Sequence, residues 1–228
     1  MSEGVSVVVM AYNEVDGLEP VVREIRATLD ALARPAEIVI VDDGSRDGTG
    51  ALADRLAAEI TGVRAVHHVP NQGLGGVYRT GFREARMDFL TFFPADGQFP
   101  PEIIARFLPL MDGHDLVLGH LPGGRKGIMG IVLSRAERLL YRALFGPLPR
   151  FQGIFMIRRT ALQRLTLVSD GRGWAVVMEM IVRAVRAGFR IRSEPTSLRP
   201  RTAGVSKVQN ARTIWSNLRQ VVELKGRL

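Results

Sequence analysis

Polar and glycine-rich residues gather at four places in the sequence, and each place follows an apolar run. The four segments are Ala11–Glu14, Asp42–Ser45, Asn71–Gly76 and Ala95–Gln98. Their carboxylates can accept hydrogen bonds from hydroxyl and N–H groups, and carboxylate oxygens are ligands that Mg²⁺ and related cations prefer. Asn, Asp and Gly are also ordinary loop residues, so one such segment alone would indicate only a loop. Four in succession indicate a ligand-binding site.

The runs before these segments predict strands. They are Val5–Met10, Ala36–Val41, Val63–Val69, Phe89–Phe93 and Asp115–Leu118. Helical spacing between them predicts helices over Leu18–Leu32, over Asp47–Ile60 with Asp47 as a possible N-cap, over Val77–Ala85, and from Pro100 onward. This alternation predicts an α/β fold with a mixed, mainly parallel sheet flanked by helices. Ligands bind at the carboxyl ends of such strands, where the four polar segments fall.

After Gly119 the alternation changes. The expected elements are a loop over Pro122–Gly130, an amphipathic helix over Ser134–Phe145, a strand over Phe151–Ile157, a helix over Trp174–Ala187, an extended segment in Phe189–Leu198 and a last helix near Ala211–Leu224. There is no internal repeat and no low-complexity linker. We therefore expect a single domain over 1–228, with a ligand-binding half in 1–120 and a basic, partly helical half in 121–228.

Charge is distributed unevenly between these halves. Residues 1–120 contain 10 Lys/Arg and 18 Asp/Glu, whereas residues 121–228 contain 21 Lys/Arg and 5 Asp/Glu. An arginine-rich proteome would explain the use of Arg but not the asymmetry. A strongly basic half indicates an anionic partner, such as a phosphorylated substrate or an acidic lipid surface. No known nucleic-acid motif is present, so we do not expect nucleic-acid binding.

Composition excludes several classes of protein. The chain has no Cys, which excludes disulfide scaffolds, thiolate zinc sites and cysteine nucleophiles. Of its four His, His67 and His68 are expected to be packing or surface residues and not ligands. No apolar run approaches the about 20 residues of a membrane span, and the N-terminus lacks the basic start of a signal peptide. The expected compartment is the cytoplasm.

Six segments together resemble the family 2 glycosyltransferases, and most of all the polyprenol-phosphate sugar transferases of the dolichol-phosphate mannosyltransferase-like branch. The segments are Val5–Glu14, Glu37–Thr49, Asn71–Gly81, Ala95–Glu102, Gln152–Arg158 and Arg201–Lys207. The resemblance implies a GT-A fold, a nucleotide-diphosphate-sugar donor, a divalent cation and inversion at the anomeric carbon. The Gly73–Gly76 stretch does not complete a G-x-G-x-x-G motif, because Tyr78 stands at the third glycine position.

The resemblance also implies a donor site. Its residues are Ala11, Tyr12, Asn13, Glu14, Asp42, Asp43, Gly44, Asn71, Gly75, Ala95 and Asp96. Tyr12, Glu14 and the two aspartates suit the base and ribose. Asp96 and Gln98 match the metal ligands, for Mg²⁺ or Mn²⁺, and Asp96 is also assigned to catalysis. The family usually has Asp-x-Asp here, whereas this chain has Pro94-Ala95-Asp96, so the first carboxylate is missing.

On the acceptor side, Arg201 and Lys207 match the family motif R-x-x-G-x-S-K and are implied to be catalytic, at phosphates. Ser134 matches a branch position near the acceptor phosphate. The branch's Gly-Ser-Arg reads Gly119-His120-Leu121, and Gly130 replaces the arginine four residues before Ser134. Arg125, Lys126 or Arg135 could compensate.

Two functions fit these residues. The first is a metal-dependent hexosyltransferase that uses a polyprenyl-phosphate-type lipid and lies at the inner face of the membrane. An anionic lipid surface or a small membrane subunit would hold it there. The alternative is a family 2 relative that binds a nucleotide sugar but is non-catalytic or uses a non-lipid acceptor.

Overall fold

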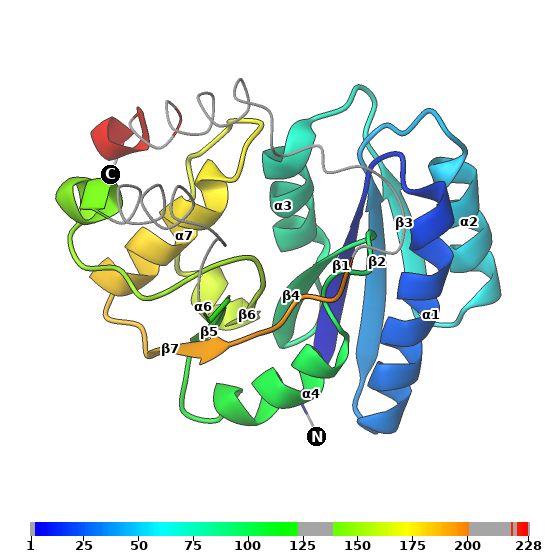
Figure 1. The fold of residues 1–228 in the computed structure, drawn as a ribbon, viewed down its shortest axis with the longest axis horizontal. Helices are drawn as coiled ribbons and strands as arrows, with labels where there is room; N and C mark the ends of the chain where they lie inside the picture. Colours follow the sequence, from blue (N-terminus) through cyan, green and yellow to red (C-terminus); the bar gives the residue numbers. More distant parts are fainter. Residues whose placement is uncertain (1–2, 123–138, 201–219, 221–222, 228) are drawn as a thin grey trace.

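Seven strands form one sheet in the computed structural model, which describes residues 3–122, 139–200, 220 and 223–227 (Figure 1). The strands are β1 (Val5–Ala11), β2 (Ala36–Asp42), β3 (Val63–His67), β4 (Phe89–Pro94), β5 (Leu116–His120), β6 (Phe155–Arg158) and β7 (Ile191–Pro195). The helices are α1 (Val15–Ala31), α2 (Thr49–Glu59), α3 (Gly73–Glu84), α4 (Glu102–Phe107), α6 (Arg159–Leu162) and α7 (Ala175–Arg186), with a 3₁₀ turn at Leu108–Met111. Residues 139–145 and 223–227 are also helical.

The strand order is β3-β2-β1-β4-β6-β5-β7. β1 pairs in parallel with β2 and β4, β2 with β3, and β5 with β7. β6 alone among these seven strands runs antiparallel to its neighbours, β4 and β5. The predicted mixed, mainly parallel sheet flanked by helices is therefore confirmed. The continuous apolar runs form its central strands because both of their faces are covered.

Apolar side chains fill both faces of the sheet. On one face, α1, α2 and α4 contribute Leu18, Leu56 and Phe107, all fully buried. On the other face, α3 and α7 pack above β4 and β6, and Tyr78 lies between the rings of Phe92 and Phe155. Tyr78, at the position where a dinucleotide motif has glycine, is thus a core residue. Its burial raises the pKa of its phenol well above the ordinary value.

Most elements differ from their predicted ranges by a few residues, and for three of them the structure shows the reason. The helix predicted over Val77–Ala85 begins at Gly73, because the Asp43 carboxylate accepts hydrogen bonds from the first amides. The strand predicted over Val63–Val69 ends at His67, before a cis Val69–Pro70 bond. The strand predicted over Phe151–Ile157 is only β6, because Gly153 has a φ of 98° that ends extended pairing.

None of the helices in the described part of the chain is long and apolar enough to cross a bilayer. The helix predicted over Ala211–Leu224 lies almost wholly outside the described residues, as does the first part of the helix predicted over Ser134–Phe145.

Candidate active site

Three loops start side by side at the carboxyl edge of the sheet. The chain runs from β1 outward to β2 and β3, then returns to place β4 on the other side of β1. The ladder continues past the strand ends, since Asp43 N donates to Ala11 O at 2.9 Å and Ala95 N donates to Met10 O at 3.0 Å. This reversal of strand order is the place where open α/β sheets bind ligands.

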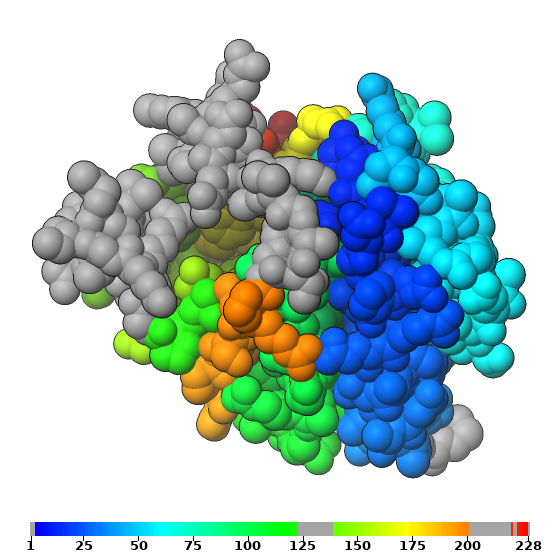
Figure 2. Space-filling view, turned by 45° about the vertical axis from the view of Figure 1, so that its right-hand side comes forward, coloured from blue at the N-terminus to red at the C-terminus, as the bar shows by residue number. Residues whose placement is uncertain are grey.

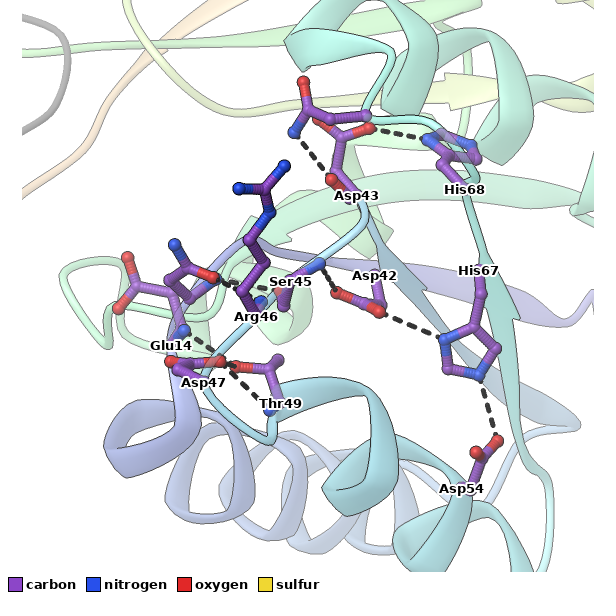
Figure 3. Close-up of polar contacts among 12 residues, drawn as sticks. Glu14, Asp42, Asp43, Ser45, Arg46, Asp47, Thr49, Asp54, His67 and His68 are labelled. Carbon is purple, nitrogen blue, oxygen red and sulfur yellow. Dashed lines mark hydrogen bonds and ion pairs between the residues drawn. The ribbon is translucent and has the colours of Figure 1, made fainter.

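The loop after β1 is bound to the loop after β2. Asn13, with a φ of 50°, donates its amide to Ser45 Oγ at 2.9 Å and accepts from the Arg46 amide at 2.8 Å. The Glu14 amide donates to Thr49 Oγ1 at 2.9 Å. These contacts fix the backbone at Asn13 and Glu14, and Figure 3 shows Glu14 beside Thr49. The neighbouring Tyr12 is 38% exposed.

Asp47 contributes to the same junction. Its carboxylate accepts from the amides of Thr49 at 3.1 Å and Val15 at 3.3 Å, which are the first residues of α2 and α1. The N-cap position of α2 is Gly48, so the predicted capping acts from one residue earlier. These hydrogen bonds lower the pKa of Asp47 although desolvation opposes them.

Asp42 is almost fully buried and faces β3 and α2. Its Oδ1 accepts from Ser45 N at 3.1 Å, and its Oδ2 lies 3.1 Å from His67 Nδ1. His67 Nε2 in turn lies 3.0 Å from Asp54 Oδ1 (Figure 3). The hydrogen bond with Asp42, and then that with Asp54, raises the pKa of His67. A Cβ on Gly50 would lie 2.9 Å from Asp42 Oδ2, so α2 needs glycine there.

Asp43 is equally buried and joins the loop after β2 to α3. Its carboxylate accepts from Gln72 N at 2.8 Å and Gly73 N at 2.9 Å, and lies 2.7 Å from His68 Nδ1. His68 Nε2 is 2.8 Å from Thr80 Oγ1 on α3. A carboxylate at the first amides of a helix also suits the positive end of the helix dipole. Asp43 therefore fixes where α3 begins.

Gly73 and Gly75 of the Gly73–Gly76 stretch pack closely against the backbone of residues 171–173. Gly75 N donates to Arg172 O at 2.9 Å, and a Cβ on Gly75 would lie 2.2 Å from Gly171 O. Asn71 donates to Asp43 O at 2.6 Å, and the Arg172 guanidinium donates to Asn71 O at 2.7 Å. Residues 171–173 thus close over the loop before α3.

The loop after β4 contains the two residues that match metal ligands. Asp96 is 7% exposed, and its Oδ1 accepts from Gln98 N at 3.1 Å around Gly97, which has a φ of 70°. Ala95 lies beneath the first turn of α1, where a Cβ on Gly17 would meet Ala95 O at 2.4 Å.

The residues in this loop fit a hard divalent cation. Asp96 and Gln98 offer a carboxylate and an amide oxygen, and the described residues contain no cluster of three or more His, Asp or Glu that could enclose an ion. Mg²⁺ and Mn²⁺ commonly take one or two protein oxygens and complete their shell with phosphate and water. The donor set therefore suits an ion that is shared with a phosphorylated ligand.

The structure brings the predicted donor-side residues to one edge of the sheet, from Ala11–Glu14, Asp42–Gly44, Asn71, Gly75 and Ala95–Gln98. Six predicted residues lie outside the described residues: Arg125, Lys126, Ser134, Arg135, Arg201 and Lys207.

Sequence reasoning missed the part played by two histidines. His67 and His68, expected only to pack or lie at the surface, each hold one aspartate of the loop after β2. The register of β2 against β3 places Asp42 opposite His67, and the sequence alone does not show that register.

Comparison with known proteins identifies the class of molecule. The model of the family "Glycosyl transferase family 2" matches residues 6–167, and the chain belongs to that family. The resemblance drawn from the sequence is thereby confirmed.

Two curated relatives and one solved structure show how far the similarity extends. The chain is 32% identical over 234 residues to a polyprenol monophosphomannose synthase of Mycolicibacterium smegmatis, covering 95% of this chain and 83% of that protein. It is 32% identical over 212 residues to an undecaprenyl-phosphate mannosyltransferase of Micrococcus luteus, covering 88% and 86%. A glucosyl-3-phosphoglycerate synthase of Mycobacterium tuberculosis, crystallised with Mn²⁺, uridine diphosphate and phosphoglyceric acid, shares the fold with a TM-score of 0.68 at 21% identity. The match covers 96% of this chain and 79% of that one.

Proposed function

We propose that this chain is an inverting hexosyltransferase that moves a sugar from a nucleoside diphosphate to the phosphate of a polyprenyl-type lipid, with Mg²⁺ or Mn²⁺. The observation that carries the proposal is the meeting of three polar loops at the switch point of the sheet, with buried Asp96 among them. The two curated relatives, named for polyprenol and undecaprenyl-phosphate mannose transfer, support the lipid-phosphate acceptor.

The donor is assigned to the loops after β1 and β2. Tyr12 and Glu14 take the base and ribose, because their loop lies at the carboxyl edge and its backbone is fixed by the next loop. Asp42 and Asp43 are also assigned to the donor. In addition, the Asp42 carboxylate holds Ser45 and the Asp43 carboxylate holds the start of α3. The backbone around the donor is assigned to the remaining predicted residues, which are Ala11, Asn13, Gly44, Asn71, Gly75 and Ala95.

The diphosphate is assigned to the loop after β4. Asp96 and Gln98 would hold the divalent cation, which when bound offsets the charge that grows on the departing diphosphate. The glycosyl transferase with the same fold that was crystallised with Mn²⁺ and uridine diphosphate is consistent with this assignment. Burial keeps Asp96 away from bulk water, where its interaction with a cation would be weaker.

The acceptor is assigned to the basic half. A phosphate oxygen of the lipid attacks the anomeric carbon, a new carbon–oxygen bond forms on the face opposite the diphosphate, and the nucleoside diphosphate leaves with the bonding electrons. The second pKa of a phosphate monoester is about 6, so no protein base is needed. Arg201 and Lys207 are assigned to the phosphates, and Arg125, Ser134 and Arg135 to the acceptor phosphate.

A transfer assay tests this function. The purified chain is incubated with Mn²⁺ or Mg²⁺, a polyprenyl phosphate and each of several nucleotide sugars, and products are separated by mass. We expect glycosylated lipid phosphate and nucleoside diphosphate in equal amounts, and neither with Asp96→Ala. Nucleotide binding without transfer to any acceptor would support the non-catalytic alternative. Transfer only to phosphoglycerate would support the non-lipid alternative.

We further propose that the basic half brings the enzyme to an anionic membrane surface. Residues 121–228 carry 21 Lys/Arg, and a basic residue near such a surface contributes about 1 kcal/mol. Flotation with vesicles of anionic or neutral lipid, at low and high salt, tests this location. Binding should require anionic lipid and should weaken with salt. Absence of binding at low salt would favour a small membrane subunit as the anchor.

A further inference from the structure

The chain that leaves β7 runs along α4 and the loop after β4 toward α1. Figure 2 shows this segment, in orange, against α4 in green and α1 in blue. Three described contacts hold it on the way. Arg106 of α4 donates to Pro195 O at 2.9 Å, Thr196 N donates to His120 O at 2.7 Å, and Arg199 N donates to Gln98 O at 2.8 Å. We call residues 195–199 the strap.

Arg199 anchors the end of the strap. Its guanidinium lies 2.6 Å from Glu24 Oε1 on α1 and 3.0 Å from both carboxylate oxygens of Glu102 at the start of α4. One side chain thus joins α1 to α4, while its own amide is hydrogen-bonded to the loop after β4 at Gln98 O.

We propose that Arg199 is a positioning residue that fixes the register between the loop Ala95–Gln98 and the chain leading to Arg201. This proposal rests on the proposed function, because its consequence concerns both the cation ligands and the acceptor side. Gln98 is held from one side by its own amide on Asp96 and from the other by the strap. Arg199 lies two residues before Arg201 in the sequence, so the strap connects the loop assigned to the cation with the segment that the proposed function assigns to phosphate.

If Arg199 only added an ion pair to the fold, its removal would affect folding stability and nothing else. The Arg199 side chain is 38% exposed and its partners 42% and 65% exposed, and pairs of this kind add little to folding stability. Removing the guanidinium should therefore leave the melting temperature nearly unchanged. A positioning role predicts local loosening of the loop after β4 and a loss of function that is larger than the loss of stability.

The chain offers a matched control. Arg55 of α2 also pairs with two carboxylates, Glu19 of α1 and Glu59 of its own helix, and is 51% exposed. It lies on α2, away from the strap and from the candidate site residues. Arg55→Ala removes the same kind of ion pairs without touching the loop after β4.

Hydrogen exchange of the free protein tests the positioning role without relying on the proposed activity. We expect the amides of residues 96–99 to exchange about tenfold faster in Arg199→Ala than in wild type. In Arg55→Ala they should match the wild type. The charge-swapped variant Arg199→Glu with Glu24→Arg and Glu102→Arg should restore slow exchange. Equal exchange in Arg199→Ala and Arg55→Ala would overturn the proposal.

Binding and kinetics extend the test to function. Arg199→Ala should weaken Mn²⁺-dependent binding of the nucleoside diphosphate several-fold by calorimetry, and lower kcat/KM for the lipid phosphate by about tenfold, with the charge swap recovering most of both. If Arg199→Ala shows faster hydrogen exchange in residues 96–99 but wild-type kinetics, the strap does not affect catalysis. Faster exchange in a chain that transfers no sugar would count against the proposed function and leave the positioning role supported.

Discussion

The strands β1–β4 and the strands β5–β7 belong to one sheet, yet they handle charge in opposite ways. In the first group, acidic side chains at strand ends are bound to nearby loops, as Asp43 is to the start of α3. In the second group, arginines reach back to acidic residues of the first. Arg158 pairs with Glu3 before β1 and Arg199 with Glu24 and Glu102, whereas Arg190 pairs with Asp115 within the second group.

This difference shows that the two sides of the candidate site are built in different ways. The side assigned to the donor is built mainly from short loops that follow adjacent strands and bind one another, with residues 171–173 closing over the loop before α3. The side assigned to the acceptor depends on contacts between residues far apart in the chain, such as Arg199 and Glu24. Changes on the donor side should therefore act on the chemistry itself, whereas most changes in the arginine-rich region should act through binding or position.

Glu179 is an exception in the second region and gives the largest expected effect. It is fully buried on α7 and accepts from the amides of Val168 and Ser169 at 2.7–3.1 Å, while Arg183 lies 2.7 Å away. Breaking such a buried pair costs about 3 kcal/mol, so Glu179→Ala should lower the melting temperature by about 6–12 °C. The exposed Glu59→Ala is the control and should change it little. An unchanged melting temperature for Glu179→Ala would show that this buried acid is dispensable.

Loss of Asp96 should be the largest effect on chemistry. Asp96→Ala removes the carboxylate assigned to the cation, and lost stabilisation of the departing charge costs about 3–4 kcal/mol, or more than a hundredfold in rate. Initial rates with Mn²⁺ or Mg²⁺, together with calorimetry of nucleoside diphosphate binding, measure it. Wild-type turnover in this variant would mean that the loop after β4 does not hold the cation.

Loss of either basic residue that matches the acceptor motif, Arg201 or Lys207, should have a smaller effect than loss of Asp96. Arg201→Ala and Lys207→Ala each remove a charge-assisted contact to phosphate, worth about 1.5–3 kcal/mol, or tenfold to over a hundredfold in kcat/KM. The melting temperature should stay near that of wild type. Kinetics that are unchanged in both variants would place this segment away from the substrates and weaken the contrast between the two regions.

The smallest effect concerns His67 and pH. Asp42 and Asp54 raise its pKa above the ordinary 6.5, so the native state binds the proton more tightly than the unfolded chain. Its contribution to stability is then fully present below about pH 6.5 and is lost as the pH rises through the raised value. The side chain is 34% exposed, so the contribution should stay below about 1 kcal/mol.

Urea unfolding of the wild type and of His67→Gln at pH 5.5 and pH 8.5 measures this contribution. The stability difference between the two proteins should be larger at pH 5.5. A difference that grows toward pH 8.5 would contradict the assigned direction of the pKa shift.

The donor loops could be predicted because their signals are local. Gly97 and Gly44 adopt positive φ, and Asp96 forms its turn with a residue two positions on, so sequence spacing was sufficient. The tasks of His67 and His68 could not be predicted, because their partners are set by which strands lie side by side. The antiparallel direction of β6 could not be predicted either, because a short apolar run does not show which strands will lie beside it.

The placement of β5 beside β6 has a consequence for engineering. Leu118 pairs with Phe155, and the two strands are antiparallel neighbours, so their connection over residues 121–154 needs no crossover. Its length is therefore not dictated by the sheet, and its two ends lie together. That connection contains Arg125, Ser134 and Arg135, all assigned to the acceptor. The acceptor assignment therefore predicts that exchanging this connection between family members changes the acceptor preference and leaves nucleotide binding unchanged.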